Sequence, residues 1–362
     1  MRKLKIMHII TGLNPGGAER VVYDLCKHLD KVRFDNIVVV MSEKDLLVPV
    51  FLDSSIQTIS LKMKKNPFSF IRGLKKIKNV IQSEQVDILH AHMYHAMVAG
   101  VCLKKMTMGI PLVFTPHNIK MGTFLRDVTS FFLRPFRDVD ILFAPYHKKF
   151  FLKKKFTVIP NGIAFIEPEQ IPKFEKFTFL MVGRLEPVKN HLAIFPIVQK
   201  LKSLHNFQLL IAGTGELEPL MREKCRESGL EGVVHILGFR GDIQELCSKS
   251  HVMLMPSLWE GFPIVLLEAG LSRLPVISTQ VGSIAELIDH KTGYTGEIAQ
   301  FEQLMTHVME NYDEAKSKGA LLHERIKDQF NMEKIAAMHE KMYEDQFNKK
   351  SQSQKKAMLL QL

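Results

Sequence analysis

The sequence has no uninterrupted apolar run of the roughly 18 residues that a membrane-spanning helix requires. Its four cysteines are scattered, without the paired spacing of a zinc site or a disulfide framework. The dinucleotide fingerprint G-x-G-x-x-G is also missing, because the third glycine of a pattern starting at Gly213 would fall on Glu218. We therefore expect no membrane span, no disulfide or zinc framework and no nicotinamide cofactor. A reducing, cytoplasmic location fits this cysteine usage best.

The charge is unevenly distributed along the 362 residues. Residues 1–170 carry 26 Lys and Arg against 14 Asp and Glu, whereas residues 171–362 carry 23 against 24. A basic amino-terminal half predicts an anionic partner there, either membrane head groups or a pyrophosphate-bearing acceptor, and we expect no nucleic-acid partner. The overall composition, 46% hydrophobic and 24% charged, is that of a globular protein, and the length favours two domains.

Short β-rich runs alternate with helical stretches from end to end, which predicts an α/β fold with parallel sheets. A turn at Asn161-Gly162 and a Pro- and Glu-bearing segment interrupt this alternation before it restarts at Phe177. We therefore predict two doubly wound, Rossmann-like domains, 1–170 and 171–331. A helix over 332–347 and a loosely ordered basic tail over 348–362 are expected to follow them.

Parallel α/β sheets bind ligands at the carboxyl ends of their strands, so the loops after predicted strands are the candidate sites. The loop Gly12–Gly17 ends in Gly16 and Gly17, which would let a phosphate approach the start of the next helix. A tight structural turn is the alternative. After the strand Phe177–Val182, Arg184 and Lys189 would suit a diphosphate, Arg184 by bidentate contact and Lys189 as a mobile charge.

A third loop runs from Glu260 to Glu268 and has the most specific pattern. Pro263 suits the first position of a helix, which would leave the N–H groups of Ile264 and Val265 facing a phosphate. Glu260 and Glu268 could each accept hydrogen bonds from a pair of hydroxyls, one on a hexose and one on a ribose. A glycosidase pair needs carboxylates about 5–9 Å apart, and the intervening helix argues against it. The alternative is purely structural, with one glutamate capping the helix and the other a solvated surface residue.

Histidines gather in the predicted first domain. His117, followed by Asn118, ends a strand and could contact a sugar or move a proton, although a capping or core role is also open. His90 and His92 share one face of a strand, a spacing that could bind zinc, but histidines at a strand end more often line a polar cleft. We therefore expect no metal there. The pair Asp138 and Asp140 precedes a predicted strand, and a helix end accounts for it better than a metal site.

Several of these motifs occur together in an order that resembles the family 4 (group 1) glycosyltransferases. The segments that carry the resemblance lie between about residues 5 and 300 and are Gly16-Gly17-Ala18-Glu19-Arg20, Asn161-Gly162, Gly183-Arg184 with Lys189, Gly213-Thr214-Gly215-Glu216, Gly238, and Glu260 to Glu268. The resemblance implies the GT-B architecture, two Rossmann-like domains facing a central cleft, with acceptor on the first domain and donor on the second. It also implies that the helix 332–347 crosses back onto the first domain.

The resemblance further implies roles for individual residues. Arg184 and Lys189 would hold the diphosphate, Glu268 the ribose, and Glu260 with the backbone of Gly261, Phe262 and Pro263 the transferred sugar. The donor-binding set is completed by Gly16, Gly17, Gly183, Gly213, Gly215, Phe239, Ile264 and Val265. Their positions at the ends of predicted strands, and not the resemblance, are the reason that His117 is expected to be catalytic and that His90, His92 and Asn118 are expected to lie on the acceptor side. Members of the family retain anomeric configuration without metal or protein nucleophile, the leaving phosphate taking the acceptor proton.

Two departures from the family pattern bear on the donor. Pro263 stands where many members have glycine, and Ala164 stands where an acidic residue is frequent. We expect a UDP-sugar such as N-acetylhexosamine or galactose, with GDP-mannose as the alternative. The expected acceptor is a glycan or lipid-linked glycan of a bacterial surface polysaccharide, built at the inner membrane face. The rival hypotheses are a sugar-nucleotide epimerase or phosphorylase of the same architecture and a non-catalytic nucleotide- or polysaccharide-binding partner.

Overall fold

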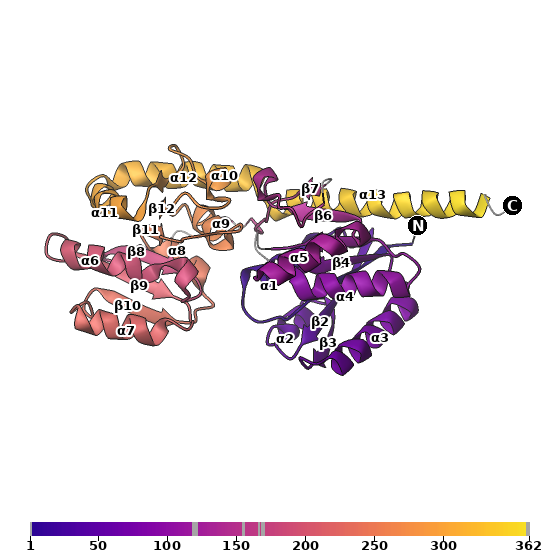
Figure 1. Cartoon of the computed structure of the whole chain (residues 1–362). Helices are drawn as coiled ribbons and strands as arrows, with labels where there is room; N and C mark the ends of the chain where they lie inside the picture. The colour runs from indigo at the N-terminus through magenta and orange to yellow at the C-terminus, as the bar shows by residue number, and fades with distance from the viewer. Residues whose placement is uncertain (1, 118–121, 154–155, 166, 168–170, 360–362) are drawn as a thin grey trace. The chain divides into compact units, whose positions relative to one another are not determined.

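The computed structural model describes residues 2–117, 122–153, 156–165, 167 and 171–359. The chain forms two compact units, one of Met1–Gly162 with Met332–Leu362 and the other of Ile163–Asn331 (Figure 1). The second unit thus begins before the predicted boundary near residue 170. Its first residue is held there because the Ile163 N–H donates to the Phe330 carbonyl at 2.9 Å and Ile163 bridges to Asn331.

The first unit is a parallel sheet covered by helices. Its described elements are β1 (Leu4–Ile10), α1 (Gly17–His28), β2 (Phe34–Ser42), α2 (Val48–Asp53), β3 (Gln57–Met63), α3 (Pro67–Ser83), β4 (Ile88–His92), α4 (Met93–Met106), β5 (Leu112–Thr115), α5 (Phe124–Leu133), η1 (Arg134–Phe136), β6 (Val139–Leu142), η2 (Pro145–His147), β7 (Phe156–Val158) and α13 (Met332–Leu359). Among these residues the strand order is β3-β2-β1-β4-β5-β6-β7. The order reverses direction between β1 and β4, which is where doubly wound sheets bind ligands.

Side chains of β1 alternate between two cores, as a strand buried on both faces requires. Met7 and Ile9 join the cluster under α3 and α4. Ile6 packs with α1 and α13, and Ile10 packs with α1 and α2. His8 lies on this second face, and its side chain is fully buried. A polar ring therefore stands among the buried apolar side chains of β1.

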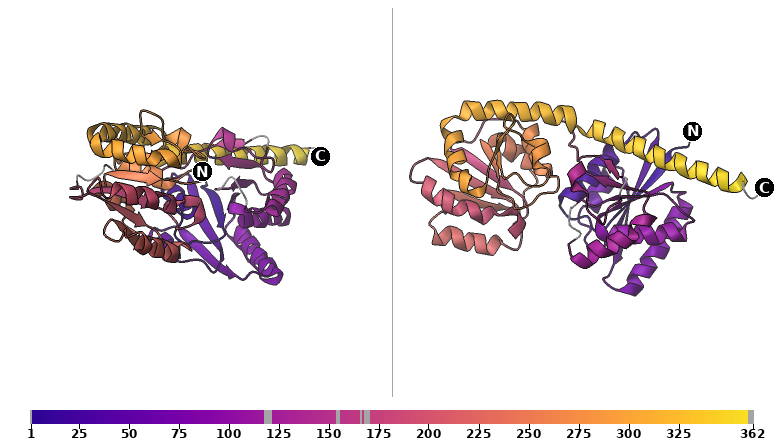
Figure 2. Two further views of the ribbon diagram at one scale, coloured as in Figure 1. Left: turned by 60° about the vertical axis from the view of Figure 1, so that its left-hand side comes forward. Right: turned by 45° about the horizontal axis from the view of Figure 1, so that its top comes forward.

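Helix α13 belongs to the first unit and extends farther than expected. Its apolar side, which includes Met332, Ile335 and Tyr343, packs into the same cluster as Ile6 of β1, and Figure 2 shows the helix lying along this unit. Arg33 pairs with Glu340 at 3.2 Å and anchors the solvent side. The prediction that residues 348–362 form a loosely ordered tail is wrong for 348–359, which continue the helix. That segment has no glycine or proline, and its four lysines, two glutamines and one alanine favour helix.

The second unit repeats the architecture. Its described elements are β8 (Phe177–Val182), η3 (Pro187–Lys189), η4 (His191–Ile194), α6 (Phe195–Leu201), β9 (Phe207–Ala212), α7 (Glu218–Glu227), β10 (Val234–Gly238), α8 (Ile243–Lys249), β11 (Val252–Met255), α9 (Ile264–Leu271), β12 (Val276–Ser278), α10 (Ile284–Leu287), β13 (Tyr294–Thr295), η5 (Ile298–Gln300), α11 (Phe301–Glu310) and α12 (Tyr312–Gln329). The described sheet has the parallel order β10-β9-β8-β11-β12-β13. Its order reverses between β8 and β11.

The sequence predicts Asp138 and Asp140 together at a helix end, but the structure places them differently. Asp140 lies inside β6, where it forms an ion pair with Arg137 at 2.9 Å, and neither side chain is exposed. The Lys153 N–H donates to the same carboxylate oxygen at 2.8 Å. Asp138 accepts the Leu112 N–H at 2.7 Å. Both carboxylates therefore stabilise the part of the sheet around β5 and β6.

Candidate functional site

The loops that follow β8 and β9 lie backbone against backbone in the second unit. Gly213 has a φ of +145°, and a Cβ atom on it would lie 1.9 Å from the Gly183 carbonyl oxygen. The Gly213 N–H donates to the Gly238 carbonyl at 2.7 Å, and the Gly183 N–H donates to the Ala212 carbonyl at 3.0 Å. Only glycine fits such a position. These glycines therefore hold the carboxyl ends of β8, β9 and β10 together, and the expected contact with a donor stays a prediction.

Lys189 and Glu260 meet where the strand order of this sheet reverses. Lys189 follows β8 and Glu260 follows β11, and Lys189 Nζ lies 2.6 Å from Glu260 Oε1. Their side chains are only 18% and 7% exposed, so solvent screens the pair weakly. The stem of Lys189 runs beside Gly183, whose Cβ position lies 3.4 Å from Lys189 Cε. The two predicted site residues are thus in contact, at the place where doubly wound sheets bind ligands.

Neighbouring residues hold Glu260 in place, and the sequence did not single them out. The Ser257 hydroxyl donates to Glu260 Oε1 at 2.7 Å. Gly282, with a φ of +55°, lies against the Glu260 backbone, since a Cβ atom on it would be 1.7 Å from the Glu260 carbonyl oxygen. The Thr279 hydroxyl donates to the Ser257 carbonyl at 2.6 Å. The signal for Gly282 was a glycine shortly after a predicted strand, but only the fold shows its partner.

The helix that follows Glu260 begins one residue later than predicted. Pro263 is the N-cap of α9, with a ψ of 113°, and the first helical residue is Ile264. The Pro263 carbonyl accepts the Leu266 N–H at 3.1 Å, as an N-cap carbonyl does. Ile264 and Val265 occupy the first turn, where N–H groups have no acceptor within the helix. Glu268 lies farther along α9 and is half-buried.

The remaining predicted donor residues of this unit lie at the ends of the same strands. Arg184 is exposed and pairs with Glu186 at 2.6 Å. Gly215 packs against Leu185, where a Cβ atom would lie 2.4 Å from the carbonyl oxygen. Phe239 directly follows β10 and is 62% exposed. Gly261 and Phe262 are buried. The structure therefore places this set at one edge of the sheet, with Arg184 and Phe239 open to solvent.

In the first unit, the predicted phosphate loop lies at the start of α1. Gly16 is the N-cap and Gly17 the first helical residue, and both are exposed. Gly16 has a φ of −175°, an extended conformation that any residue adopts. Its missing side chain instead leaves space for Glu19, whose Oε2 would lie 2.5 Å from a Cβ atom. A helix start of this kind is where a phosphate would bind, and the expected phosphate contact stays a prediction.

Two of the predicted histidines of the first unit, His92 and His117, are hydrogen-bonded to each other. His117 has a φ of +58°, a strained value that is uncommon outside glycine. Its Nε2 lies 2.9 Å from His92 Nδ1. His90 and His92 are fully buried, and with His117 they line a small pocket below α13. Their contact with an acceptor stays a prediction, and Asn118 lies outside the described residues.

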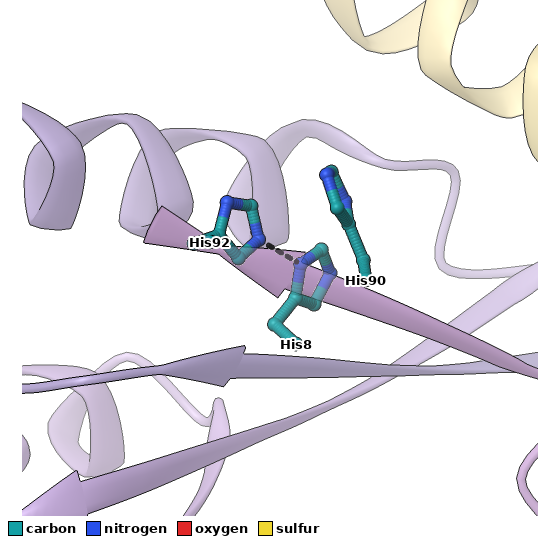
Figure 3. Close-up of side chains that lie close together, drawn as sticks. All are labelled: His8, His90 and His92. Atoms are coloured by element: carbon teal, nitrogen blue, oxygen red, sulfur yellow. Dashed lines mark hydrogen bonds between the residues drawn. The ribbon is translucent and has the colours of Figure 1, made fainter. Parts of the chain in front are cut away.

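Figure 3 shows a third buried histidine, His8 of β1, facing His92. Within the described part of the chain, His8, His90 and His92 bring ring nitrogens within 4.8 Å of one another, a spacing that could hold a metal ion. Every one of their ring nitrogens already has a hydrogen-bond partner within 3.2 Å. The bonding of these rings is therefore satisfied by the protein, and the expectation of no metal remains a prediction.

Two family models match successive parts of the chain. Residues 15–165 match the model described as Glycosyltransferase Family 4, and residues 164–327 match that of Glycosyl transferases group 1. Together they span both units. The residues 183–268 discussed above fall inside the second match, and His90, His92 and His117 fall inside the first.

Curated relatives from bacteria are similar over most of their length. The chain is 28% identical, over 81% of its own length and 82% of the relative's, to the N-acetylgalactosamine-N,N'-diacetylbacillosaminyl-diphospho-undecaprenol 4-alpha-N-acetylgalactosaminyltransferase of Campylobacter jejuni. It is 26% identical, over 77% and 80%, to the UDP-Gal:alpha-D-GlcNAc-diphosphoundecaprenol alpha-1,3-galactosyltransferase of Escherichia coli. Both relatives carry the name of a glycosyltransferase.

Solved structures with the same fold include Anabaena Alr3699/HepE in complex with UDP and glucose. That chain superposes with a TM-score of 0.84 at 19% identity, covering 94% of this chain and 100% of its own. The fold class predicted from the sequence, two doubly wound α/β units of the GT-B kind, is confirmed. No helix among the described residues is both long and apolar enough to cross a membrane.

Proposed function

Because the chain belongs to the family 4, group 1 glycosyltransferases, we propose that it transfers a hexose or N-acetylhexosamine from a UDP-sugar, with retention, to a lipid-linked glycan. The product would serve a bacterial surface polysaccharide. The observation that carries the proposal is the Lys189–Glu260 pair, 2.6 Å apart at the strand-order reversal of the second sheet. A half-buried cation in contact with a buried carboxylate offers one group for a diphosphate and one for sugar hydroxyls.

The chemistry of such a transfer needs the developing charge on the leaving diphosphate to be stabilised. Lys189 can supply a positive charge in a weakly solvated place, and Arg184, which is exposed and paired with Glu186, can bind phosphate oxygens bidentately. The first-turn N–H groups of α9 add a partial positive charge. In the proposed route no protein nucleophile attacks, and a phosphate oxygen of the donor takes the acceptor proton. His117 is assigned to contact with the transferred sugar because it directly follows the end of β5, where parallel sheets bind ligands.

The UDP donor is supported by the relatives. The Escherichia coli relative is named for UDP-Gal, and the Anabaena chain was solved with UDP. A ribose fits Glu268, since a carboxylate can accept hydrogen bonds from two neighbouring hydroxyls. An acceptor on a lipid diphosphate is supported by the names of the Campylobacter and Escherichia coli relatives, both of which include diphosphoundecaprenol in some form.

We expect UDP, but not GDP or ADP, to raise the melting temperature of the protein. A ligand at about 100 times its Kd stabilises the folded state by about 2.7 kcal/mol. Glu268→Ala should abolish most of the shift, because the ribose loses its acceptor. Differential scanning fluorimetry with millimolar nucleotide measures this.

Glu286→Ala is the matched control, since Glu286 is an exposed glutamate on α10 of the same unit. It should keep the full UDP shift. A shift with GDP alone would contradict the UDP assignment, and an equal shift in Glu268→Ala would contradict the role of Glu268. Transfer of labelled sugar to an added acceptor separates this activity from epimerisation, and its independence of inorganic phosphate separates it from a phosphorylase.

A surface of the first unit supports membrane association of the proposed enzyme. Phe124 and Leu125 of α5 are 78% and 74% exposed, and Phe132 and Phe150 are also exposed. Phe131 links the last two, with ring centroids 5.5 Å from Phe132 and 6.0 Å from Phe150. Cations accompany these side chains. Arg134 lies over the Phe131 ring at 4.1 Å, Arg126 follows Leu125 in the sequence, and the exposed Lys148 and Lys149 precede Phe150. Exposed apolar side chains with cations nearby suit an anionic bilayer surface.

Phe124→Ser combined with Leu125→Ser should weaken binding to vesicles that contain anionic phospholipid. Each exposed side chain contributes apolar area that only a bilayer would bury. Co-sedimentation at several salt concentrations measures the effect. Leu204→Ser, at a 73% exposed leucine of the second unit, is the control and should bind as the unmodified protein does. Binding that ignores lipid charge and salt would refute the membrane surface.

A further inference from the structure

Four side chains of the first unit form one continuous hydrogen-bond chain that ends at His117. Asn36 Oδ1 lies 3.2 Å from His8 Nε2, and His8 Nδ1 lies 3.1 Å from His92 Nε2 (Figure 3). His92 Nδ1 then lies 2.9 Å from His117 Nε2. The four residues come from β2, β1, β4 and the loop after β5. The chain thus crosses the sheet at the point where its strand order reverses.

All three rings of this chain are neutral at pH 7. Burial lowers the pKa of His8 to about 3 and that of His117 to about 3, and it lowers the pKa of His92 well below its ordinary value. A neutral imidazole has one N–H donor and one acceptor nitrogen. A ring that donates from one nitrogen must therefore accept at the other, so all the hydrogen bonds along this chain of side chains run in the same donor-to-acceptor direction.

The amide oxygen of Asn36 sets that direction. An amide oxygen only accepts, so His8 Nε2 carries the proton and His8 Nδ1 accepts. His92 Nε2 must then donate to His8, which leaves His92 Nδ1 as an acceptor. His117 Nε2 must in turn donate to His92. The only ring nitrogen of His117 left without a proton is Nδ1, for which the described residues provide no hydrogen bond.

We propose that His8 and His92 are positioning residues that hold His117 as its Nε2–H tautomer, so that its Nδ1 accepts a hydrogen bond from a hydroxyl of the bound sugar. The contact between His117 and a sugar rests on the proposed function, whereas the tautomer of His117 follows from the hydrogen bonds alone. The proposal also accounts for polar rings buried among apolar side chains. A rigid chain of hydrogen bonds orients a side chain whose backbone is already strained, at a φ of +58°.

His90 is not part of this hydrogen-bond chain and has hydrogen-bond partners of its own. Its Nδ1 lies 2.7 Å from the Tyr343 hydroxyl of α13 and its Nε2 lies 2.8 Å from the Thr115 hydroxyl. Hydroxyls can donate or accept, so these bonds impose no direction on the rings. His90 therefore serves as a control, with the same residue type, strand and burial as His92 but no bond to His117.

The tautomer can be measured without any donor or acceptor. In protein with ¹⁵N-labelled histidine, long-range ¹H–¹⁵N spectra distinguish protonated from unprotonated ring nitrogens, and the spectrum of His117→Gln identifies the signals of His117. We expect a protonated Nε2 and an unprotonated Nδ1 at pH 7. In His92→Leu the ring should become a mixture of tautomers, because the acceptor is gone. In His92→Asn, whose amide oxygen can stand near the lost Nδ1, the tautomer should be kept.

The variants that lose the Nε2–H tautomer of His117 should also have a lower kcat. We expect His92→Leu to lower kcat about tenfold or more with little change in donor KM, since misplacing a positioned group costs up to about 10²-fold. His92→Asn should recover most of kcat. His90→Asn, which leaves the chain to His117 intact, should keep the His117 tautomer. Melting temperatures show which variants fold.

Three results would overturn the proposal: a protonated Nδ1 on His117 in the unmodified protein, an unchanged tautomer in folded His92→Leu, or stoichiometric zinc retained by the histidines after purification. Failure of the proposed function looks different, because the tautomer would then be as expected while no donor supports transfer. The unmodified protein alone decides the tautomer, so unfolded variants do not leave the question open.

Discussion

Lys189→Met should lower kcat/KM for sugar transfer by about 10²- to 10³-fold, the effect of removing one preorganised charge-stabilising group from an active site. The Lys189 side chain is 18% exposed, and its Nζ stands 2.6 Å from Glu260 Oε1. The substitution removes the positive charge expected to face the leaving diphosphate, and it also leaves the Glu260 carboxylate buried without its counter-charge. Initial rates at varied donor and acceptor concentrations measure the loss.

Two further variants separate catalysis from folding. Lys200→Met removes a lysine of the same unit that pairs with Glu302 at the surface and is 68% exposed, and it should keep full activity. Lys189→Met with Glu260→Gln removes the unpaired buried charge, so it should recover melting temperature but not activity. If Lys189→Met alone transferred sugar at the unmodified rate, the proposed use of this pair would be wrong.

Gly282→Ala should destabilise the second unit by about 3 kcal/mol, from backbone strain and overpacking combined. Gly282 has a φ of +55°, and the added Cβ would stand 1.7 Å from the Glu260 carbonyl oxygen. The loop that carries Glu260 must therefore move, and we expect donor binding to be lost together with stability. Urea unfolding followed by the UDP thermal shift measures both.

Gly232→Ala is the matched control for that substitution. A Cβ atom at Gly232 would have no neighbour within 4 Å, and its φ lies outside the left-handed region. Alanine there restricts the unfolded chain without straining the folded one, so stability should stay the same or rise slightly. Equal stability of the Gly282→Ala and unmodified proteins would show that the Glu260 loop tolerates displacement.

Much of the fold was predictable because its signals are local. The alternation of strands and helices requires only neighbouring residues, and it predicted two parallel sheets. The tail after Phe347 was mispredicted because its polar residues suggested a loose terminus, although none of 348–359 is a helix breaker. The start of α9 was displaced by one residue, since proline suits both the N-cap seen here and the first helical position expected.

The sequence by itself determined the family, the doubly wound class of both units and the residue types at the carboxyl ends of the strands. Only the tertiary structure decided that Lys189 bonds to Glu260, that Gly282 supports the Glu260 backbone, and that His8 and Asn36 lie behind His92 and His117. The physical reason is that these partners are far apart along the chain. Sequence patterns report periodicity within an element, whereas strand order and register bring residues such as His8 and His92 onto one face of the sheet.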